Sequence, residues 1–247
     1  MTEVLVRETQ GVVRRRRGPE LTVRDAVALR WLGEQYGARL DVLGVLLGRL
    51  GGADGPLSVT RRVEVVARWK RLGLVRAEKL PDGTWVTLTA KGLGLAGLED
   101  LSPWRMPLLK LRHTHAVNVV RLAYEATGEA VAAPWVSERV TWQERGKQTW
   151  HVPDGVIRSV DGSGSGQSVN VEVELKRKHR REYRDDVFAK LRRGTFPVRA
   201  VWYLVPDERF RVRLEAELTA VLGAEPVVHV SVRVLPVVPG VSYMDRW

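Results

Sequence analysis

The stretch VNVEVELK, residues 169–176, decides how the fold is interpreted. Apolar side chains occupy every odd position and polar side chains every even position. Successive side chains of a strand point to opposite faces of a sheet, so this period of two predicts a β-strand with one apolar face. The other face would carry Asn170, Glu172, Glu174 and Lys176.

A second strand is expected just upstream, at residues 150–160. It contains Pro153, Asp154 and Gly155, and the loop DGSGSGQS separates it from the stretch above. Such a polar, glycine-rich loop allows the two strands to pair as a hairpin. Asp154 would then lie beside Glu174.

Further elements surround this hairpin. A helix is expected before it and a strongly basic helix after it, with more strands and one more helix beyond. The expected helices are residues 110–127, 179–193 and 208–222, and the expected strands are 135–142, 150–160, 169–176, 198–205 and 227–235. The core order is therefore αβββαβ, in an α+β or α/β domain over residues 109–247.

This half resembles the PD-(D/E)xK nuclease superfamily. Pro153 and Asp154 are followed, at an interval of twenty positions, by Glu174-Leu175-Lys176 within the matching order of elements. The resemblance implies a Mg²⁺ or Mn²⁺ ion held by Asp154, Glu174 and the backbone carbonyl of Leu175. Such an ion relieves the repulsion between two carboxylates and polarises a scissile phosphate and a water molecule.

The same resemblance gives Lys176 a catalytic role, orienting or deprotonating the water or stabilising charge on the phosphate. Glu172 shares the predicted face and is a candidate ligand or base. Glu125 and Glu138 are candidates for an additional acidic residue. Alternating charges are also common on solvated strands, and many members of this superfamily keep the fold without cleavage, so the motif predicts a possible metal-dependent endonuclease rather than a certain one.

The first hundred residues predict a different unit. Thr22 and Asp25 resemble an N-capping pair for a helix that ends at Gly37, with an apolar face expected at Val23, Ala26, Leu29, Leu32 and Tyr36. Further helices are expected at residues 42–50 and 58–72, a hairpin at 74–88, and a closing helix up to Leu98. The phrases RWKRLGLV and WVTLTAKG in this unit resemble the recognition-helix exit and the wing of winged helix-turn-helix DNA-binding domains.

A winged helix over residues 20–100 would place its third helix in the major groove of double-stranded DNA. An apolar side is expected at Val59, Val63, Val66 and Trp69. The candidate DNA contacts on this helix are Ser58, Thr60, Arg61, Arg62 and Arg68. The alternative is a winged helix that contacts protein. In the second half, the candidates for phosphate contact are Lys178, Arg180 and Arg181.

Charge supports a polyanionic partner. The 247 residues carry 40 Lys and Arg against 29 Asp and Glu, a formal charge of +11, and no Cys. Nine basic and three acidic residues fall within residues 176–193 alone. Arg14 to Arg17 form a second cluster in a basic arm, residues 1–19, which either contacts phosphates or is a solvated tail. No membrane span or signal peptide is recognised, so a cytoplasmic location is expected.

The whole chain, from about residue 20 to 206, resembles the replication-relaxation proteins of plasmids and integrative elements. The matching phrases are LTVRDAVALRWL, RLGLV, VTLTAKG, HTHAVNVVRLA, PDGVI and VEVELKRK. The resemblance implies a DNA-binding accessory in replication, relaxation or transfer, with a relaxase or replication protein as a further partner. Many proteins of that family have another residue in place of the lysine of the Glu-x-Lys motif, whereas this sequence keeps the lysine as Lys176.

Two alternatives remain open at this point. One is a non-catalytic regulator or relaxosome scaffold with a vestigial nuclease fold, and the other is a transcriptional repressor whose second domain forms a homodimer. Residues 101–108, with two prolines, are expected to link the halves.

Histidine and tryptophan residues give weaker signals. His113 and His115 point about 200° apart on a helix and cannot chelate one metal together. One of the two is a candidate for approaching the site or DNA, although capping or core packing is the simpler interpretation. His151 is expected on the strand face opposite to Asp154, without a role. Trp104 and Trp150 are candidates for stacking on bases, although core packing is again simpler.

Overall fold

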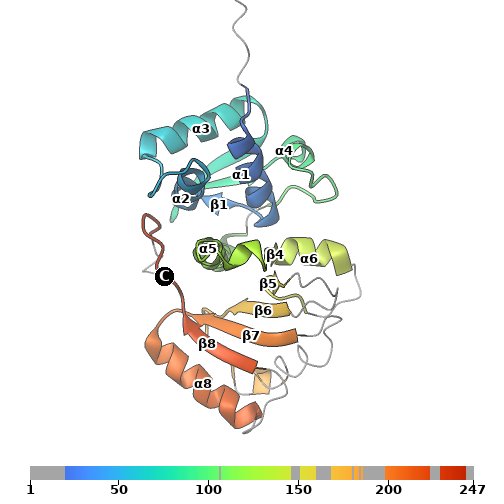
Figure 1. Ribbon diagram of the computed structural model, residues 1–247, viewed down its shortest axis with the longest axis vertical. Coiled ribbons are helices and arrows are strands. Elements are labelled where there is room, and N and C mark those ends of the chain that lie inside the picture. Colours follow the sequence, from blue (N-terminus) through green and yellow to red (C-terminus); the bar gives the residue numbers. More distant parts are fainter. Residues whose placement is uncertain are drawn as a thin grey trace, which may run out of the picture.

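The computed structural model describes most of the chain in a layered α+β arrangement (Figure 1). The described residues are 20–105, 107–145, 151–159, 168–179, 181–183, 185, 198–222 and 229–242. The predicted basic arm, most of the predicted basic helix with Arg180, and Trp150 lie outside these residues.

The N-terminal unit contains the elements expected from the sequence. Its helices are α1 (Val23–Glu34), α2 (Leu40–Leu50), α3 (Val59–Arg71) and α4 (Ala90–Leu95). Its strands are β1 (Ala38–Arg39), β2 (Val75–Leu80) and β3 (Gly83–Leu88), antiparallel in the order β1-β3-β2. The predicted capping pair is confirmed, because Thr22 and Asp25 form a reciprocal capping box at the start of α1.

The predicted helix faces were partly wrong. In α1, Val23 is 83% exposed, while Ala28 and Trp31 are buried with Leu29 and Leu32. In α3, Val59 and Val63 are exposed, and the buried residues are Val65, Val66 and Trp69. The valines of α3 lie on both its exposed and its buried sides, and those of α1 lie on its exposed side, so apolar spacing alone could not fix which side faces the core.

The second half begins with α5 (Leu108–Glu125) and a short 3-10 turn, η1 (Glu129–Val131). The remaining elements are β4 (Trp135–Ser137), α6 (Glu138–Arg145), β5 (Gly155–Arg158), β6 (Ser168–Val173), β7 (Val198–Val205), α8 (Glu208–Leu222) and β8 (His229–Val234). The strands form one sheet in the order β4-β5-β6-β7-β8. Strands β4, β5 and β6 are antiparallel, and β6, β7 and β8 are parallel.

The predicted strand at residues 135–142 is wrong after its third residue. The chain turns into α6 at Glu138, and the Ser137 hydroxyl accepts a hydrogen bond from the Val140 N–H at 3.3 Å. A serine in that position caps a helix start, which stops the strand.

The deciding stretch also ends earlier than expected, at Val173. The Val173 N–H donates to the carboxylate of Asp154 at 2.7 Å, while the Glu174 N–H still donates to the Leu204 carbonyl of β7 at 2.9 Å. Glu174, Leu175 and Lys176 follow the strand instead of belonging to it. The predicted apolar face is confirmed, because Val171 and Val173 are buried in one cluster with Leu175 packed against it.

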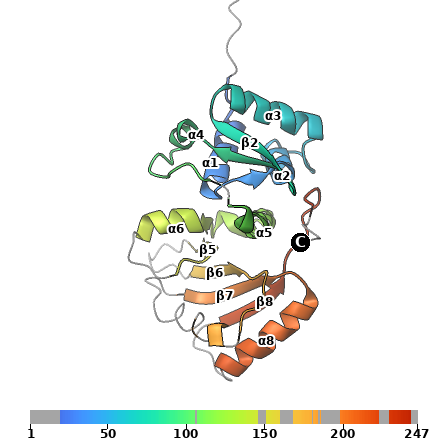
Figure 2. The ribbon, with the colours of Figure 1, turned by 180° about the vertical axis from the view of Figure 1, so that it is seen from behind.

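Helix α5 lies between the two halves (Figure 2). Val119 and Leu122 are buried in the core of the N-terminal unit, whereas Val117 and Val120 are buried against the sheet. Helix α8 covers the opposite face of the sheet. The two halves therefore share one helix as part of both cores.

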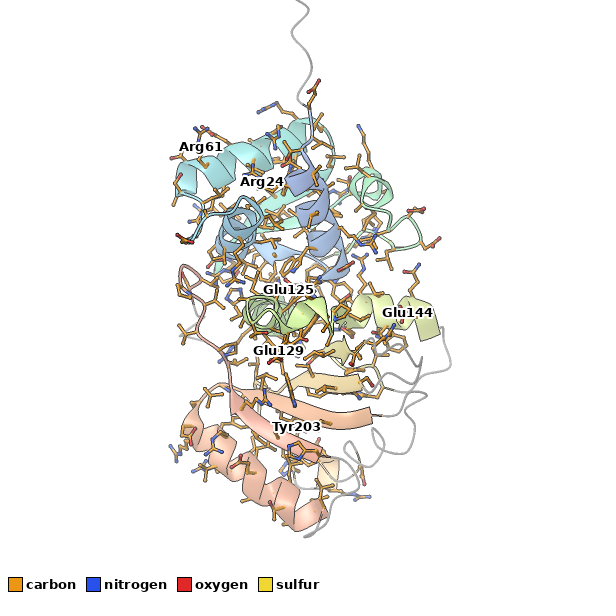
Figure 3. All side chains as sticks on the ribbon, viewed as in Figure 1. Arg24, Arg61, Glu125, Glu129, Glu144 and Tyr203 are labelled. Carbon is orange, nitrogen blue, oxygen red and sulfur yellow. The ribbon has the colours of Figure 1, made fainter. Side chains whose placement is uncertain are left out.

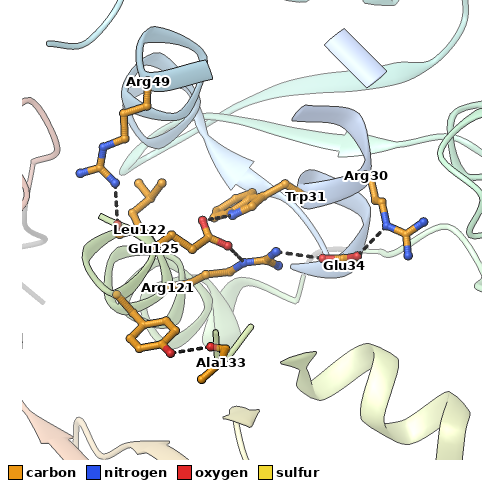
Figure 4. Close-up of polar contacts among 9 residues, drawn as sticks. Arg30, Trp31, Glu34, Arg49, Arg121, Leu122, Glu125 and Ala133 are labelled. Atoms are coloured by element: carbon orange, nitrogen blue, oxygen red, sulfur yellow. Dashed lines mark hydrogen bonds and ion pairs between the residues drawn. The ribbon is translucent and has the colours of Figure 1, made fainter. Parts of the chain in front are cut away.

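Polar contacts strengthen this junction (Figure 4). The Arg121 guanidinium donates to Glu125 at 2.6 Å and to Glu34 of α1 at 2.9 Å, and the Trp31 indole donates to Glu125 at 2.9 Å. The prediction that Glu125 supplements the acidic site is therefore wrong, because its carboxylate joins α5 to α1.

The linker and the C-terminal segment also pack across the junction. Trp104 lies against Tyr36, with ring centroids 5.4 Å apart, and the Ser102 carbonyl accepts from Arg139. Val238 and Val241 complete the core of the N-terminal unit. No helix among the described residues has the length and hydropathy needed to cross a bilayer.

Candidate functional site

A groove of about 850 Å³ lies between the tip of the β2–β3 hairpin, the start of α5 and the end of β6. The hairpin contributes Pro81 and Asp82 to it. The other lining residues that the sequence predicted as a site are Asp154, Glu172, Glu174, Leu175, Lys176 and Lys178. We call this the carboxylate groove. The fold thus brings the predicted acidic and basic residues to one place, beside a hairpin from the other half.

Asp154 is held in position by two groups. Its Oδ2 accepts from the Val173 N–H at 2.7 Å and lies 3.2 Å from Nε2 of His113 on α5. The same His113 nitrogen lies 3.2 Å from the Val173 carbonyl oxygen. A helix and a strand end therefore both hold the same oxygen of this carboxylate.

Charge is concentrated around Asp154. Burial would lower the pKa of His113, but the Asp154 carboxylate outweighs it and raises that pKa to about 9. Burial raises the pKa of Glu138, and the nearby negative charge of Asp154 adds to the effect. Glu138 thus lies close enough to Asp154 to feel its charge, from α6 rather than from the predicted strand.

Glu172 forms a second histidine–carboxylate pair. Its Oε1 lies 2.8 Å from Nε2 of His151, and both residues line the carboxylate groove. The expectation that His151 lies on the face opposite to Asp154 is wrong, because both residues line the same groove. Residues 151–154 precede β5 without being part of it, so the alternation of a regular strand does not apply to them.

Glu174 contacts a lysine four positions further along the chain. Its Oε2 lies 2.7 Å from Nζ of Lys178, whose backbone N–H donates to the Tyr183 hydroxyl at 3.1 Å. Glu172 and Glu174 are only 7% and 8% exposed, so the alternative of a solvated strand face is wrong for both. Lys176 is exposed at the groove.

The groove can be compared with the needs of a divalent metal ion. The oxygen donors of Asp154 and Glu174 are the type that Mg²⁺ and Mn²⁺ prefer, and both residues line the same groove. Within the described parts of the chain, however, no three His, Asp or Glu side chains are grouped closely enough to form a metal site. The donors fit in kind, and Asp154 and Glu174 contact the side chains of His113 and Lys178 respectively.

The predicted DNA contacts on α3 differ in their surroundings. Ser58 caps the helix by accepting from the Arg61 N–H, and Arg61 itself is exposed and paired with Glu64 at 3.0 Å. Figure 3 shows Arg61 on the outer side of α3, away from α5. Thr60 is exposed, and Arg62 is half-buried.

Arg68 is a structural residue. Its guanidinium lies 2.6 Å from both carboxylate oxygens of Asp25, a side chain that is 0% exposed. The prediction that Arg68 is a prime DNA contact is therefore not supported by its position. Of the basic candidates after β6, Lys178 pairs with Glu174, and Arg181 is exposed near Asp185 at 3.9 Å.

Sequence reasoning left His113 undecided and missed His151 and the hairpin tip. His113 and His115 differ as their spacing requires: His115 is buried and contacts the Ser242 carbonyl at 2.9 Å, whereas His113 lies at the groove. Only the tertiary packing of α5 on β6 shows which of the two belongs to the site.

Comparison with known proteins gave no match: no family model, no curated protein and no solved structure is significantly similar to this chain.

Proposed function

We propose that this protein binds double-stranded DNA through its N-terminal unit and hydrolyses a phosphodiester bond in the carboxylate groove. The observation that carries the proposal is the convergence of Asp154, Glu174 and Lys176 on one groove, next to a hairpin from the other half. A pair of carboxylates with a lysine is the grouping that metal-dependent phosphodiester cleavage requires.

The N-terminal unit supports the DNA-binding part. Three helices precede a hairpin, Thr60 and Arg61 of α3 are exposed, and Arg61 lies on the outer side of the helix. We take this unit as a winged helix-turn-helix in which α3 enters the major groove. The sequence phrases quoted above resemble the replication-relaxation proteins, and on that resemblance we propose a role in replication, relaxation or transfer of a mobile element.

The second half supports the hydrolytic part. Its order of elements is consistent with a PD-(D/E)xK nuclease-like core, with Asp154 directly before β5 and Glu174 directly after β6. Asp154, Glu174 and the Leu175 carbonyl would hold Mg²⁺ or Mn²⁺, which would activate water and neutralise phosphate charge. The Val173 N–H and His113 orient Asp154, and Lys176 supplies a cation at the groove.

The test is nicking of supercoiled plasmid by purified protein with Mg²⁺ or Mn²⁺. Asp154→Ala and Lys176→Ala should each lower the rate by about 100-fold or more, because each removes a group that acts on the reacting phosphate or water. Asp54→Ala removes an exposed carboxylate in a turn and should leave the rate unchanged. Absence of nicking by the parent protein, or equal nicking by all variants, contradicts the nuclease proposal.

A second function has its own support. The carboxylates of Asp154 and Glu174 already contact the cations His113 and Lys178, which stabilises the groove without a metal. A non-catalytic DNA-binding accessory is the corresponding candidate. Thermal denaturation with and without Mg²⁺, Mn²⁺ or Ca²⁺ separates the two candidates. If the groove binds the metal ion, the ion should raise the melting temperature of the parent protein but not that of Asp154→Ala. If the groove binds no metal ion, the melting temperature of the parent protein should not change.

A further inference from the structure

A second hollow, of about 440 Å³, lies beside the carboxylate groove on the other side of the first turn of α5. Its aromatic lining residues are Tyr36, Trp104 and Trp142. We call it the aromatic hollow. The two cavities are adjacent, because Leu109, His113, His151 and Asp154 line both.

The aromatic rings are held from several elements. Trp104 lies against Tyr36 at 5.4 Å between centroids, and the Arg139 guanidinium lies 5.1 Å from the Tyr36 centroid. Trp142 extends from α6 and is 39% exposed, and its indole N–H is 3.4 Å from Glu138. Flat, partly exposed rings on a fixed support are what stacking on a nucleobase requires.

The backbone of Tyr36 is unusual. Its φ is 68°, and no other residue apart from glycine has a positive φ in the described parts of the chain. Gly37 follows it, where an added Cβ would meet Thr87 and the Val86 carbonyl at 2.8 and 2.9 Å. Such conformations are costly for a bulky residue and concentrate at functional sites. Here the strained turn places the Tyr36 ring in the aromatic hollow.

Leu109 lies at the junction of the two cavities. Its side chain is 98% exposed, although leucine is among the residues most often buried. Apolar side chains in such positions separate stacked bases in proteins that distort DNA. A strand that passes from the groove to the hollow would cover Leu109 and remove it from water.

We propose that the aromatic hollow binds the base of an unpaired nucleotide from a DNA strand that lies in the carboxylate groove, with Leu109 separating that base from its neighbour. Its volume is within the range of roughly 300–1,000 Å³ that holds small ligands, which suits one nucleoside and excludes a duplex. Glu138 and Lys110 line the hollow and offer polar groups to the base edge. This inference rests on the proposed function and specifies its substrate as a locally unpaired strand.

The test measures binding of fluorescein-labelled 12-nucleotide single strands in EDTA, where no cleavage occurs. One strand carries bases, and the other is abasic with the same phosphates. The wild-type protein should bind the strand with bases between about 5-fold and 100-fold more tightly, because stacking adds to phosphate contacts. Trp142→Ala and Leu109→Ala should each reduce this ratio, and Trp142→Phe should retain most of it.

Two controls are matched to the variants. Phe210→Ala removes a half-buried ring from α8, on the far face of the sheet, and Val131→Ala shortens an apolar side chain that is 91% exposed on η1. Neither should change the ratio. If the wild-type protein binds duplex but binds the two single strands equally, only the proposal for the aromatic hollow is overturned. If it binds neither the single strands nor the duplex, the DNA-binding proposal is overturned as well.

Discussion

Asp25 both caps the start of α1 and joins α1 to α3. It is 0% exposed, and its carboxylate accepts from the Thr22 backbone and hydroxyl, from Arg68 and from the Trp69 indole. The sequence predicted only the first of these roles, because a capping box is local. The contacts with α3 lie more than forty positions away and carry no signal in the local pattern.

Asp25→Ala should lower the free energy of unfolding by about 3–5 kcal/mol, because it leaves buried donors and the Arg68 charge without their partner. Urea denaturation followed by circular dichroism measures the change. Asp54→Ala, at an exposed turn, should change stability by less than about 0.5 kcal/mol. Equal effects of the two substitutions would contradict the role assigned to Asp25.

The same residue should make stability depend on acid. Burial would raise the pKa of Asp25, but hydrogen bonds from Thr22 and Trp69 and the charge of Arg68 together lower it below 3.8. A lowered pKa in the folded state stabilises the protein above the unfolded pKa, and this contribution is lost as the pH falls through the folded value. The stability difference between wild type and Asp25→Asn should thus be constant from pH 7 to about 5 and decrease below about pH 4. A difference that stays constant down to pH 2 would exclude this linkage.

At the scale of elements, the sequence predicted the helices and strands of the N-terminal unit well, since caps, glycines and a hairpin turn mark their ends. It also predicted β6, β7 and α8 from clear periodicity. It failed where a local cap or a tertiary contact intervened. Ser137 starts α6 inside an apparent strand. Strand β6 ends at Val173, whose N–H donates to Asp154 from outside the local pattern.

The candidate site was likewise predicted where the signal is local and missed where the contact is tertiary. Asp154, Glu172 and Glu174 were found because strand alternation and spacing place them together. His113, His151 and the hairpin tip were not assigned, because each reaches the groove from another element. Arg68 was assigned to DNA because the phase of α3 was uncertain, and its actual partner is Asp25.

Helix α3 can be tested as a DNA-contacting element. Arg61→Ala should weaken duplex binding and reduce the slope of log affinity against log salt by about 1, since one phosphate contact is lost. Arg209→Ala removes a similarly exposed arginine from α8 and should leave the slope unchanged. Fluorescence anisotropy at several salt concentrations measures both. An unchanged slope in Arg61→Ala would argue against a phosphate contact at this position.

At the scale of the whole molecule, the C-terminal segment returns to the N-terminal core. Val238 is 2% exposed in that core, whereas its neighbour Val237 is 80% exposed. The Ser242 N–H also donates to Asp41 at 3.0 Å. The last described residues therefore stabilise the first helices.

Val238→Ala should lower the free energy of unfolding by roughly 1–3 kcal/mol, while Val237→Ala should have almost no effect. Because α5 and this segment belong to the N-terminal core, the loss should appear as a shift of one cooperative transition. Differential scanning calorimetry measures both the shift and the number of transitions. Two separate transitions, with only one of them shifted, would show that the halves unfold independently.

The sharing of α5 by two cores has a consequence for geometry on DNA. A helix packed on both sides cannot bend or swivel as a tether would, so the outer side of α3 and the carboxylate groove keep a constant separation. If the proposed function is correct, the protein then sets a fixed distance between the DNA bound by α3 and the site of cleavage. The break in the strand would fall at a set number of base pairs from the sequence that α3 reads, whatever the sequence between them.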